Sequence, residues 1–508
     1  MALSSLSKLF YKYLRNFSFV PVWQRVSRSP RSSHRGCQTQ NVILSNSSLA
    51  CRKDRSQFGT LACPYAQKKL TLLNCEVLIQ QVKRKFNSWS VRALSFAGRL
   101  LLIKTVIAGI TNFWCSSFML PKACIKRINS LCGVFLWKGN IEDRHTARVS
   151  WEVVTKPKTE GGLGVRNLEI WNKACILKLI WLLFFEAGLI WVAWCTETVL
   201  NGDLNSFWTV KPSTRNSWLV NKLLKLRSEI YDWIKLRVRN GETCRLWTDN
   251  WSTFGCLKSY LATDLNSSLG IRENATLSSL FRNNHWNLPH PRSEKQLQLH
   301  TFLTTVELTT EEDFYEWELE GNIQTTFSTG KVYAILSRHG ENVPWVHIVG
   351  IVGGIPKHSF LCRLFLLNRC PTRDRLLSWG LLTSPTCLLC NSSPESCDHL
   401  YFLCPYSWSL WFPLARRCGL DPQQQWTDIT TQLQSYNSRN RRGRLILLTW
   451  QCCISCTWQE RNNRLHRNTF RSVDVLTRLI DRQIRDRILS YRERSPRLSS
   501  KMKQQWLA

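Results

Sequence analysis

The segment CLLCNSSPESCDHLYFLC, residues 387–404, concentrates side chains that bind soft metal ions. Two residues separate Cys387 from Cys390 and four separate His399 from Cys404, so the spacing is C-x2-C-x8-H-x4-C. Zinc prefers four thiolate or imidazole ligands in a tetrahedron, and a C-x2-C pair supplies two of them from one tight turn. The pattern therefore predicts a zinc site wrapped by a polar loop.

Chance offers an alternative, because the chain has 21 cysteines in 508 residues. A C-x2-C pair alone is unsurprising at that frequency, whereas a pair followed by H-x4-C is much less expected. Cys397 lies two residues from His399 and competes as a ligand. The spacing thus favours zinc and leaves a cysteine-lined apolar turn open.

Other catalytic signatures are missing from the sequence. It contains no phosphate-binding G-x-x-x-x-G-K-[ST] loop, no G-x-S-x-G elbow and no H-E-x-x-H pair. No Asp-Asp dipeptide occurs, although polymerases use paired carboxylates to hold two metal ions. The acidic run Glu311–Glu316 indicates a solvated face. Cys452, Cys453 and Cys456 lie in an apolar helical run, which favours core packing.

The charge balance of the chain is strongly basic. Lys and Arg total 69 against 35 Asp and Glu, giving a net charge of +34 and a pI near 9.8. This surplus favours polyanionic partners, either nucleic acid or an anionic membrane surface. Many scattered cysteines without an apolar secretory signal favour a reducing compartment.

Helical periodicity predicts the elements that position these residues. Ser95 is expected to cap a helix with an apolar face through Ile110, and residues 126–139 form a second helix. A long apolar helix is expected from Leu168 to Trp194. The stretch Cys175–Cys195 within it is long enough to span a bilayer, but Lys178 and Glu186 would be costly there. A buried bundle helix is therefore favoured, with a membrane span as the alternative.

Two further elements are expected towards the C-terminus. Asn240-Gly241 predicts a hairpin of two short strands within Val238–Trp251. Val473–Ile488 predicts an amphipathic helix, within a region (439–503) that has 17 Lys and Arg against five Asp and Glu. Candidate nucleic-acid contacts are arginines for phosphates and aromatic rings for unpaired bases, although core packing is favoured for most of the rings. These candidates are Arg439, Arg441, Arg442, Arg444, Tyr401 and Trp408.

The N-terminal 57 residues differ from the rest. Residues 1–53 contain nine Lys and Arg and no acid, and residues 1–50 contain eleven serines. This composition is typical of an organelle transit peptide or of a disordered basic leader.

Several blocks of the sequence resemble plant non-LTR (LINE-type) retrotransposon reverse transcriptases, in the family's order over roughly residues 58–470. The segment FNSWSVRALSFAGRLLLIKTVI (86–107) is similar to the thumb after the polymerase palm. GGLGVRNLEIWNKACILKLIW (161–181) and NGETCRLWTDNW (240–251) resemble later blocks. PKHSFLCRLFLLNRCPTRDRLLSWGL (356–381) and the cysteine cluster resemble the terminal zinc-binding domain.

The resemblance implies a ligand set. Matched position by position, the ligands of one structural zinc ion are Cys387, Cys390, His399 and Cys404, and Cys397 lies outside the pattern. The palm and its carboxylates are not found, so we expect a chain that is catalytically inactive on its own.

The expected fold is mainly α with small β elements. Its predicted segments are a basic leader (1–57), a helical thumb-like region (58–200), a mixed connector (201–326), the zinc-binding domain (327–415) and a basic helical tail (416–508).

We expect a retrotransposon-derived protein that binds zinc and also binds RNA or DNA without sequence specificity, and that has no small-molecule substrate. A nuclear or cytoplasmic location is expected, or a mitochondrion or chloroplast if the leader targets one. The alternatives are a non-functional retroelement remnant and a membrane- or organelle-associated structural protein. The oligomeric state is not predicted.

Overall fold

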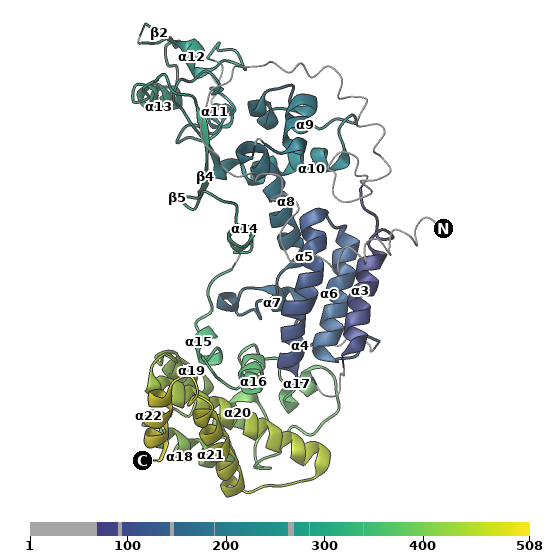
Figure 1. The fold of residues 1–508 in the computed structure, drawn as a ribbon. Helices are drawn as coiled ribbons and strands as arrows, with labels where there is room; N and C mark the ends of the chain where they lie inside the picture. The colour runs from purple at the N-terminus through teal and green to yellow at the C-terminus, as the bar shows by residue number, and fades with distance from the viewer. Residues whose placement is uncertain are drawn as a thin grey trace, which may run out of the picture. The chain divides into compact units, whose positions relative to one another are not determined.

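The computed structural model describes residues 69–89, 94–142, 147–186, 188–262, 269–283, 285–338 and 340–507. The predicted leader, residues 1–57, lies outside the described residues. Across the described ranges the chain is mainly α-helical with short β elements, as predicted (Figure 1).

The thumb-like region is a packed group of helices. Ser95 caps its second helix as predicted, since the Ser95 hydroxyl accepts the Gly98 N–H at 3.2 Å. A π-helical turn, Ile103–Ile107, joins two of the helices, and the apolar faces bury Leu78, Phe86 and Phe135 in one core. The helices are α3 (Glu76–Ser88), α4 (Phe96–Leu102), α5 (Ala108–Ser117) and α6 (Lys122–Trp137), of which α3, α5 and α6 lie side by side in Figure 1.

The predicted long helix from Leu168 to Trp194 is two helices, so that prediction is wrong. After α7 (Trp151–Thr155), α8 runs over Leu168–Phe185 and α9 over Ile190–Val199. The break contains Gly188, and glycine disfavours a helix interior because it loses the most backbone entropy. Both helices still contribute side chains to one hydrophobic core.

Within the described residues, one helical run has the length and composition of a membrane span. The continuous helical run Phe96–Ser117 is long and apolar enough to cross a bilayer, and 28% of that window is buried. A single run of this kind has little weight, since core helices of soluble proteins meet the same criterion. Cys175–Cys195 is interrupted and does not form one span.

The connector contains a small antiparallel sheet instead of the predicted hairpin. Strand β1 (Ile234–Arg237) pairs with β4 (Phe314–Leu319), which pairs with β5 (Asn322–Ile323). The predicted hairpin within Val238–Trp251 is therefore wrong. The carboxylate of Asp313 accepts the N–H groups of Arg239, Gly241, Thr243 and Cys244 at 2.7–3.2 Å, which holds this segment as a loop.

The remaining connector elements are short. The two-stranded pair of β2 (Phe281–Arg282) and β3 (His285–Trp286) stands apart from the main sheet. The helices are α10 (Trp218–Leu226), α11 (Leu257–Leu261), α12 (Leu277–Leu280) and α13 (Glu294–Leu303), and 3-10 turns cover Leu204–Trp208, Arg227–Glu229 and Tyr231–Trp233. A further 3-10 turn, Lys158–Glu160, lies between α7 and α8 in the thumb-like region.

The C-terminal helices share one hydrophobic core that extends from Ile348 to Trp506. This core includes residues on both sides of position 415, so the predicted boundary between the zinc-binding domain and the tail runs through it. The helices that contribute to this core are α15 (Val346–Val349), α16 (Pro356–Leu366), α18 (Pro405–Arg417), α19 (Trp426–Gln434), α20 (Arg441–Arg467), α21 (Val473–Leu489) and α22 (Pro496–Leu507). Helix α14 (Thr329–Leu336) instead packs in the core that contains α8, and α17 (Arg373–Ser378) buries no residue.

The tail helices follow the expected pattern of apolar faces. In α21, Leu476, Ile480, Ile484 and Ile488 are all buried, which confirms the predicted amphipathic helix. In α20, Cys452, Cys453 and Cys456 are at most 4% exposed, which confirms that they pack in the core.

A glycine loop links α16 to the thumb-like region. The Arg363 guanidinium of α16 donates to the Gly161 carbonyl, and Lys104 Nζ donates to the Leu163 carbonyl at 2.5 Å. A Cβ atom at Gly162 would lie 1.7 Å from the Lys156 carbonyl oxygen, so only glycine fits there. The Gly-Gly pair therefore permits the close backbone approach that this junction needs.

Candidate metal centre

The four predicted ligands lie together in the structure. The Sγ atoms of Cys387, Cys390 and Cys404 and a ring nitrogen of His399 all lie within 4.8 Å of one another. Cys390 Sγ and His399 Nε2 lie 3.2 Å apart. Ligands about 2.0–2.3 Å from one zinc ion would be separated by roughly 3.5–3.8 Å in a tetrahedron. Three sulfurs and one imidazole nitrogen thus fit zinc in both chemistry and spacing.

The first ligand pair is set by a tight turn. The Cys387 N–H donates to the Ser393 carbonyl at 2.7 Å, and the Asn391 N–H donates to the Cys387 carbonyl at 2.9 Å. Asn391 has a φ of +54°, a left-handed conformation that asparagine tolerates better than most residues. The Leu389 N–H also donates to Cys387 Sγ at 3.4 Å. The turn therefore orients the sulfur towards the other ligands.

The second ligand pair comes from a π-helical turn that leads into α18. His399 begins the turn His399–Leu403, and Cys404 is the residue directly before the first residue of α18. The Cys404 N–H donates to the His399 carbonyl at 2.7 Å, which fixes the two ligands relative to each other. Four intervening residues thus bring the imidazole and the sulfur to the same side.

Electrostatics favour a thiolate at Cys404. The Cys387 thiol donates to it and lowers the pKa of Cys404, while burial opposes this effect and the N–H groups of Ser407 and Tyr406 add to it. The same hydrogen bond, together with burial, raises the pKa of Cys387. Zinc binding would release the remaining thiol protons, because the ion takes thiolates as ligands.

A buried ion pair braces the loop between the ligand pairs. The guanidinium of Arg461 in α20 donates from Nη2 to Glu395 Oε1 at 2.8 Å, and its Nε lies 3.2 Å from the same oxygen. Oε1 also accepts the Arg373 N–H at 3.0 Å. Both charged side chains are at most 2% exposed. The carboxylate is therefore fully paired inside the core.

A second arginine of α20 contacts the cysteine turn directly. Arg464 Nη1 donates to the carbonyls of Leu388 and Leu389 at 3.2 and 2.8 Å. Its Nε donates to the buried carboxylate of Glu460 at 3.0 Å, and its guanidinium lies 4.5 Å from the Tyr406 ring centroid. Sequence reasoning missed these two arginines and Glu395 as supports for the site. Two signals were available in the sequence. Arg461 and Arg464 are charged residues in an otherwise apolar helical run, and Glu395 is an acid between the two ligand pairs.

Cys397 lies outside the group of four ligands, as the family pattern implied. Its side chain packs against the core, and burial raises the pKa of its thiol. This places Cys397 as a packing residue.

The predicted nucleic-acid contacts divide into exposed and buried residues. Arg439, Arg441 and Arg442 are exposed, and Arg444 is half-buried with its Nε donating to the Ser438 carbonyl at 2.9 Å. Trp408 is half-buried against Phe412.

The prediction that Tyr401 contacts nucleic acid is wrong. It is 2% exposed and its ring packs against Phe365 and Phe402 in the core, so it cannot stack on a base. Exposed aromatic rings of this part of the chain include Trp379, which is 53% exposed, with the Arg375 guanidinium 5.2 Å from its ring centroid.

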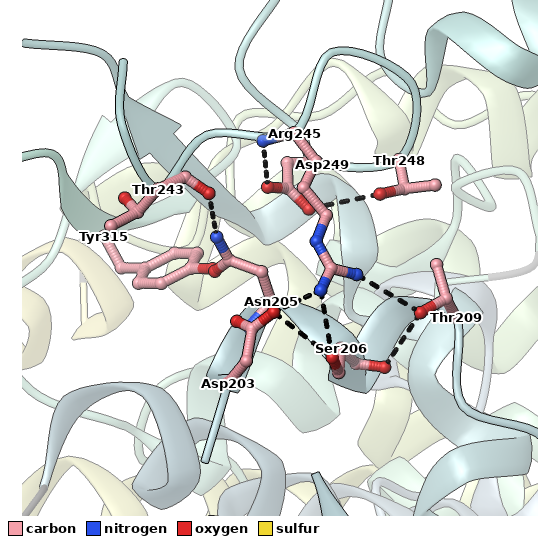
Figure 2. Close-up of polar contacts among 9 residues, drawn as sticks. All are labelled: Asp203, Asn205, Ser206, Thr209, Thr243, Arg245, Thr248, Asp249 and Tyr315. Carbon is pink, nitrogen blue, oxygen red and sulfur yellow. Dashed lines mark hydrogen bonds and ion pairs between the residues drawn. The ribbon is translucent and has the colours of Figure 1, made fainter. Parts of the chain in front are cut away.

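A separate polar cluster holds the connector together (Figure 2). Arg245 forms an ion pair with Asp203, and Asn205 links the Thr243 carbonyl to the Tyr315 hydroxyl. Asp249 is fully buried and accepts the Arg245 N–H at 2.8 Å. Burial raises the pKa of Asp249 to about 7, with the Arg245 hydrogen bond opposing the shift. These contacts join three sequence-distant segments, which indicates a structural role.

Comparison with known proteins agrees with the geometry of the cysteine site. Residues 327–411 match the family model described as "zinc-binding in reverse transcriptase". The matched residues contain all four ligands and lie inside the predicted segment 327–415. The match and the Cys3His cluster together indicate zinc.

One curated relative is a plant protein. It is an Arabidopsis thaliana protein named "Putative ribonuclease H protein", 30% identical over 189 residues, which are 37% of this chain. The match spans 30% of the relative's length. Together with the family match, it supports a retrotransposon-derived chain.

Proposed function

We propose that this chain is a retroelement-derived protein that binds RNA or DNA through a domain folded around one structural zinc ion. The observation that carries the proposal is the Cys387, Cys390, His399 and Cys404 cluster, which lies inside the matched zinc-binding segment. Its relation to plant LINE-type reverse transcriptases rests on the resemblance of the ordered sequence blocks.

The zinc ion has a structural role in this proposal. Three cysteines and one histidine fill all four positions of a tetrahedral ion, which leaves none for water or a substrate. The ligand turn is also tied to α20 by Arg461 and Arg464. Bound zinc would therefore join the cysteine turn to the start of α18, and both pack on the core that extends to α22.

Nucleic-acid binding is supported by the charge of the surface around this core. The formal net charge of the chain is +34, and residues 439–503 contribute 17 basic against five acidic residues. Exposed arginines occur before α20 and along α21, including Arg439, Arg478 and Arg482. Cations of this kind neutralise phosphates without reading the base sequence, so we propose binding without sequence specificity.

We further propose that the chain alone has no polymerase activity. The absence of an Asp-Asp dipeptide from its sequence supports this, because two-metal phosphoryl transfer needs carboxylates that hold both ions. Primer extension with Mg²⁺ by the purified chain would contradict this part of the proposal.

The test combines zinc content with salt-dependent binding. The full-length chain should contain one zinc per molecule, and its affinity for an RNA or DNA oligonucleotide should fall as salt rises. A metal-free but folded chain would refute the zinc site. An affinity that does not change between low and moderate salt would refute binding through phosphates.

A further inference from the structure

A groove lies between the thumb-like helices and the zinc-binding core. Its volume is about 720 Å³, which is within the usual range of ligand sites. Helix α4 forms one wall, and α16 and α20 form the other. The residues that line it are Ser95, Phe96, Ala97, Arg148, Lys357, Phe360, Leu361, Leu364, Ser455, Trp458, Gln459, Asn462, Asn463, His466 and Arg467.

The charged residues of this groove all have the same sign. Arg148, Lys357 and Arg467 are exposed, His466 lines the same groove, and the described residues of the lining include no carboxylate. Within the part of the chain that the structure describes, none of these four takes part in an ion pair. Cations without acidic partners around one concavity attract an anion with several charges.

Aromatic side chains form part of the lining of the groove. The rings of Phe96 and Phe360 stack with centroids 3.5 Å apart and planes 20° apart, which joins α4 to α16. Trp458 of α20 lines the same space but is only 9% exposed, with the Arg461 guanidinium 5.1 Å from its ring centroid, so it supports the groove from below. Flat apolar surfaces of this kind accept nucleobases, and every base can stack on them because every base has a π face.

Amide side chains complete the lining. Gln459, Asn462 and Asn463 lie on successive turns of α20 and face the groove together with Ser455. Amides and hydroxyls can donate hydrogen bonds to the edges of nucleobases and accept hydrogen bonds from them. A simple anion such as phosphate would need neither these groups nor the aromatic rings. The lining therefore suits a ligand that carries both phosphates and exposed bases.

We propose that this groove binds one strand of nucleic acid, with its phosphates on Arg148, Lys357 and Arg467 and a base against the half-buried ring of Phe360. The inference rests on the proposed function and assigns its binding site. Single strands fit better than duplexes because their bases are free to leave the stack.

The test uses the full-length chain and fluorescent single-stranded RNA and DNA of equal sequence and length. One variant carries Arg148→Gln, Lys357→Gln and Arg467→Gln. If each cation contacts one phosphate, the slope of log affinity against log salt should fall by about 2, and affinity should drop on the order of 50-fold at about 0.15 M salt. The RNA and DNA arms show which strand is preferred.

The matched control removes the same charge elsewhere. Lys126→Gln, Arg127→Gln and Arg215→Gln change exposed residues outside the groove and should have little effect. A further variant, Gln459→Trp, fills the groove and keeps every charge, so it should weaken single-strand binding at least tenfold. Zinc content and circular dichroism report whether each variant is folded.

The outcomes separate the two proposals. If the wild-type chain binds but the groove variant and the control lose equal affinity, the groove is not the site and the proposed function still stands. If Gln459→Trp binds normally, the groove is likewise excluded. A wild-type chain that binds no oligonucleotide refutes the proposed function and this inference together. The groove variant should lose more affinity for a single strand than for a duplex. A larger loss for the duplex would refute the single-strand assignment.

Discussion

Arg461 Nη2 of α20 lies 2.8 Å from Glu395 Oε1 in the loop between the two ligand pairs, and both side chains are at most 2% exposed. These residues are 66 positions apart in the chain. A buried charge without a partner is costly, so this pair fixes which helix packs behind the cysteine turn. The ion pair thereby ties the zinc-binding segment to the tail, whose helices share its hydrophobic core.

Replacing Arg461 with methionine should strongly destabilise the core. Glu395 would keep its charge in a buried site without its guanidinium partner, which typically costs about 3–5 kcal/mol. Urea denaturation followed by tryptophan fluorescence measures the loss in the free energy of unfolding. The control Arg467→Met, at an exposed position of the same helix, should change that free energy by less than about 0.5 kcal/mol. Equal effects of the two variants would show that the ion pair is dispensable.

Zinc binding should depend on Cys390 and not on Cys397. Cys390 lies in the ligand group, whereas Cys397 is outside that group and packs against the hydrophobic core. We expect Cys390→Ser to lose zinc and Cys397→Ser to retain one zinc per chain, as measured by elemental analysis of purified protein. Chelator treatment of the wild-type chain should lower its melting temperature, because the free energy of zinc binding contributes to folding. Zinc retained by Cys390→Ser would point to a different ligand set.

The glycine loop at Gly162 should not tolerate a side chain. A Cβ atom there would lie 1.7 Å from the Lys156 carbonyl oxygen, so the backbone must move and Gly162→Ala should destabilise by about 1–3 kcal/mol or more. Gly109 provides the control, because it lies in α5 and its Cβ would meet nothing within 4 Å. Gly109→Ala should stabilise by about 0.5–1 kcal/mol, since alanine loses less entropy in a helix. If thermal melts show Gly162→Ala to be more stable than Gly109→Ala, the close backbone approach at Gly162 is contradicted.

The connector should become less stable as pH rises from about 4 to 7. Burial raises the folded-state pKa of Asp249 to about 7, above the value of about 3.9 in an unfolded chain. The folded state therefore binds more protons in this window, and the stability gained at low pH is lost as pH rises through the folded pKa. Asp249→Asn should remove this contribution, which is at most about 1.4 kcal/mol per pH unit.

Chemical denaturation at several pH values measures that slope in the wild type and the variant. Asp232→Asn is the control, because Asp232 is exposed in the same region and should leave the slope unchanged. An identical pH dependence in wild type and Asp249→Asn would show that Asp249 does not titrate in this window.

Local patterns determined much of the fold and the identity of the metal ligands. Ser95 caps its helix because a serine before an apolar helical run accepts a first-turn N–H, and no distant residue is needed. The apolar face of α21 follows from the helical period alone. The ligand spacing likewise brought Cys387, Cys390, His399 and Cys404 to notice, because each pair is positioned by its own short turn.

Long-range contacts decided the rest. The segment after β1 is a loop and not a hairpin, because Asp313, about 70 residues later, accepts its backbone N–H groups. Tyr401 carries a stacking ring, but the tertiary core buries it. Arg461 reaches Glu395 and the groove gathers Arg148, Lys357 and Arg467 only after α4, α16 and α20 have packed. The sequence alone thus determined which side chains could bind zinc, whereas tertiary packing decided what supports that site and which basic residues converge, since burial and contact between distant segments are not encoded in local spacing.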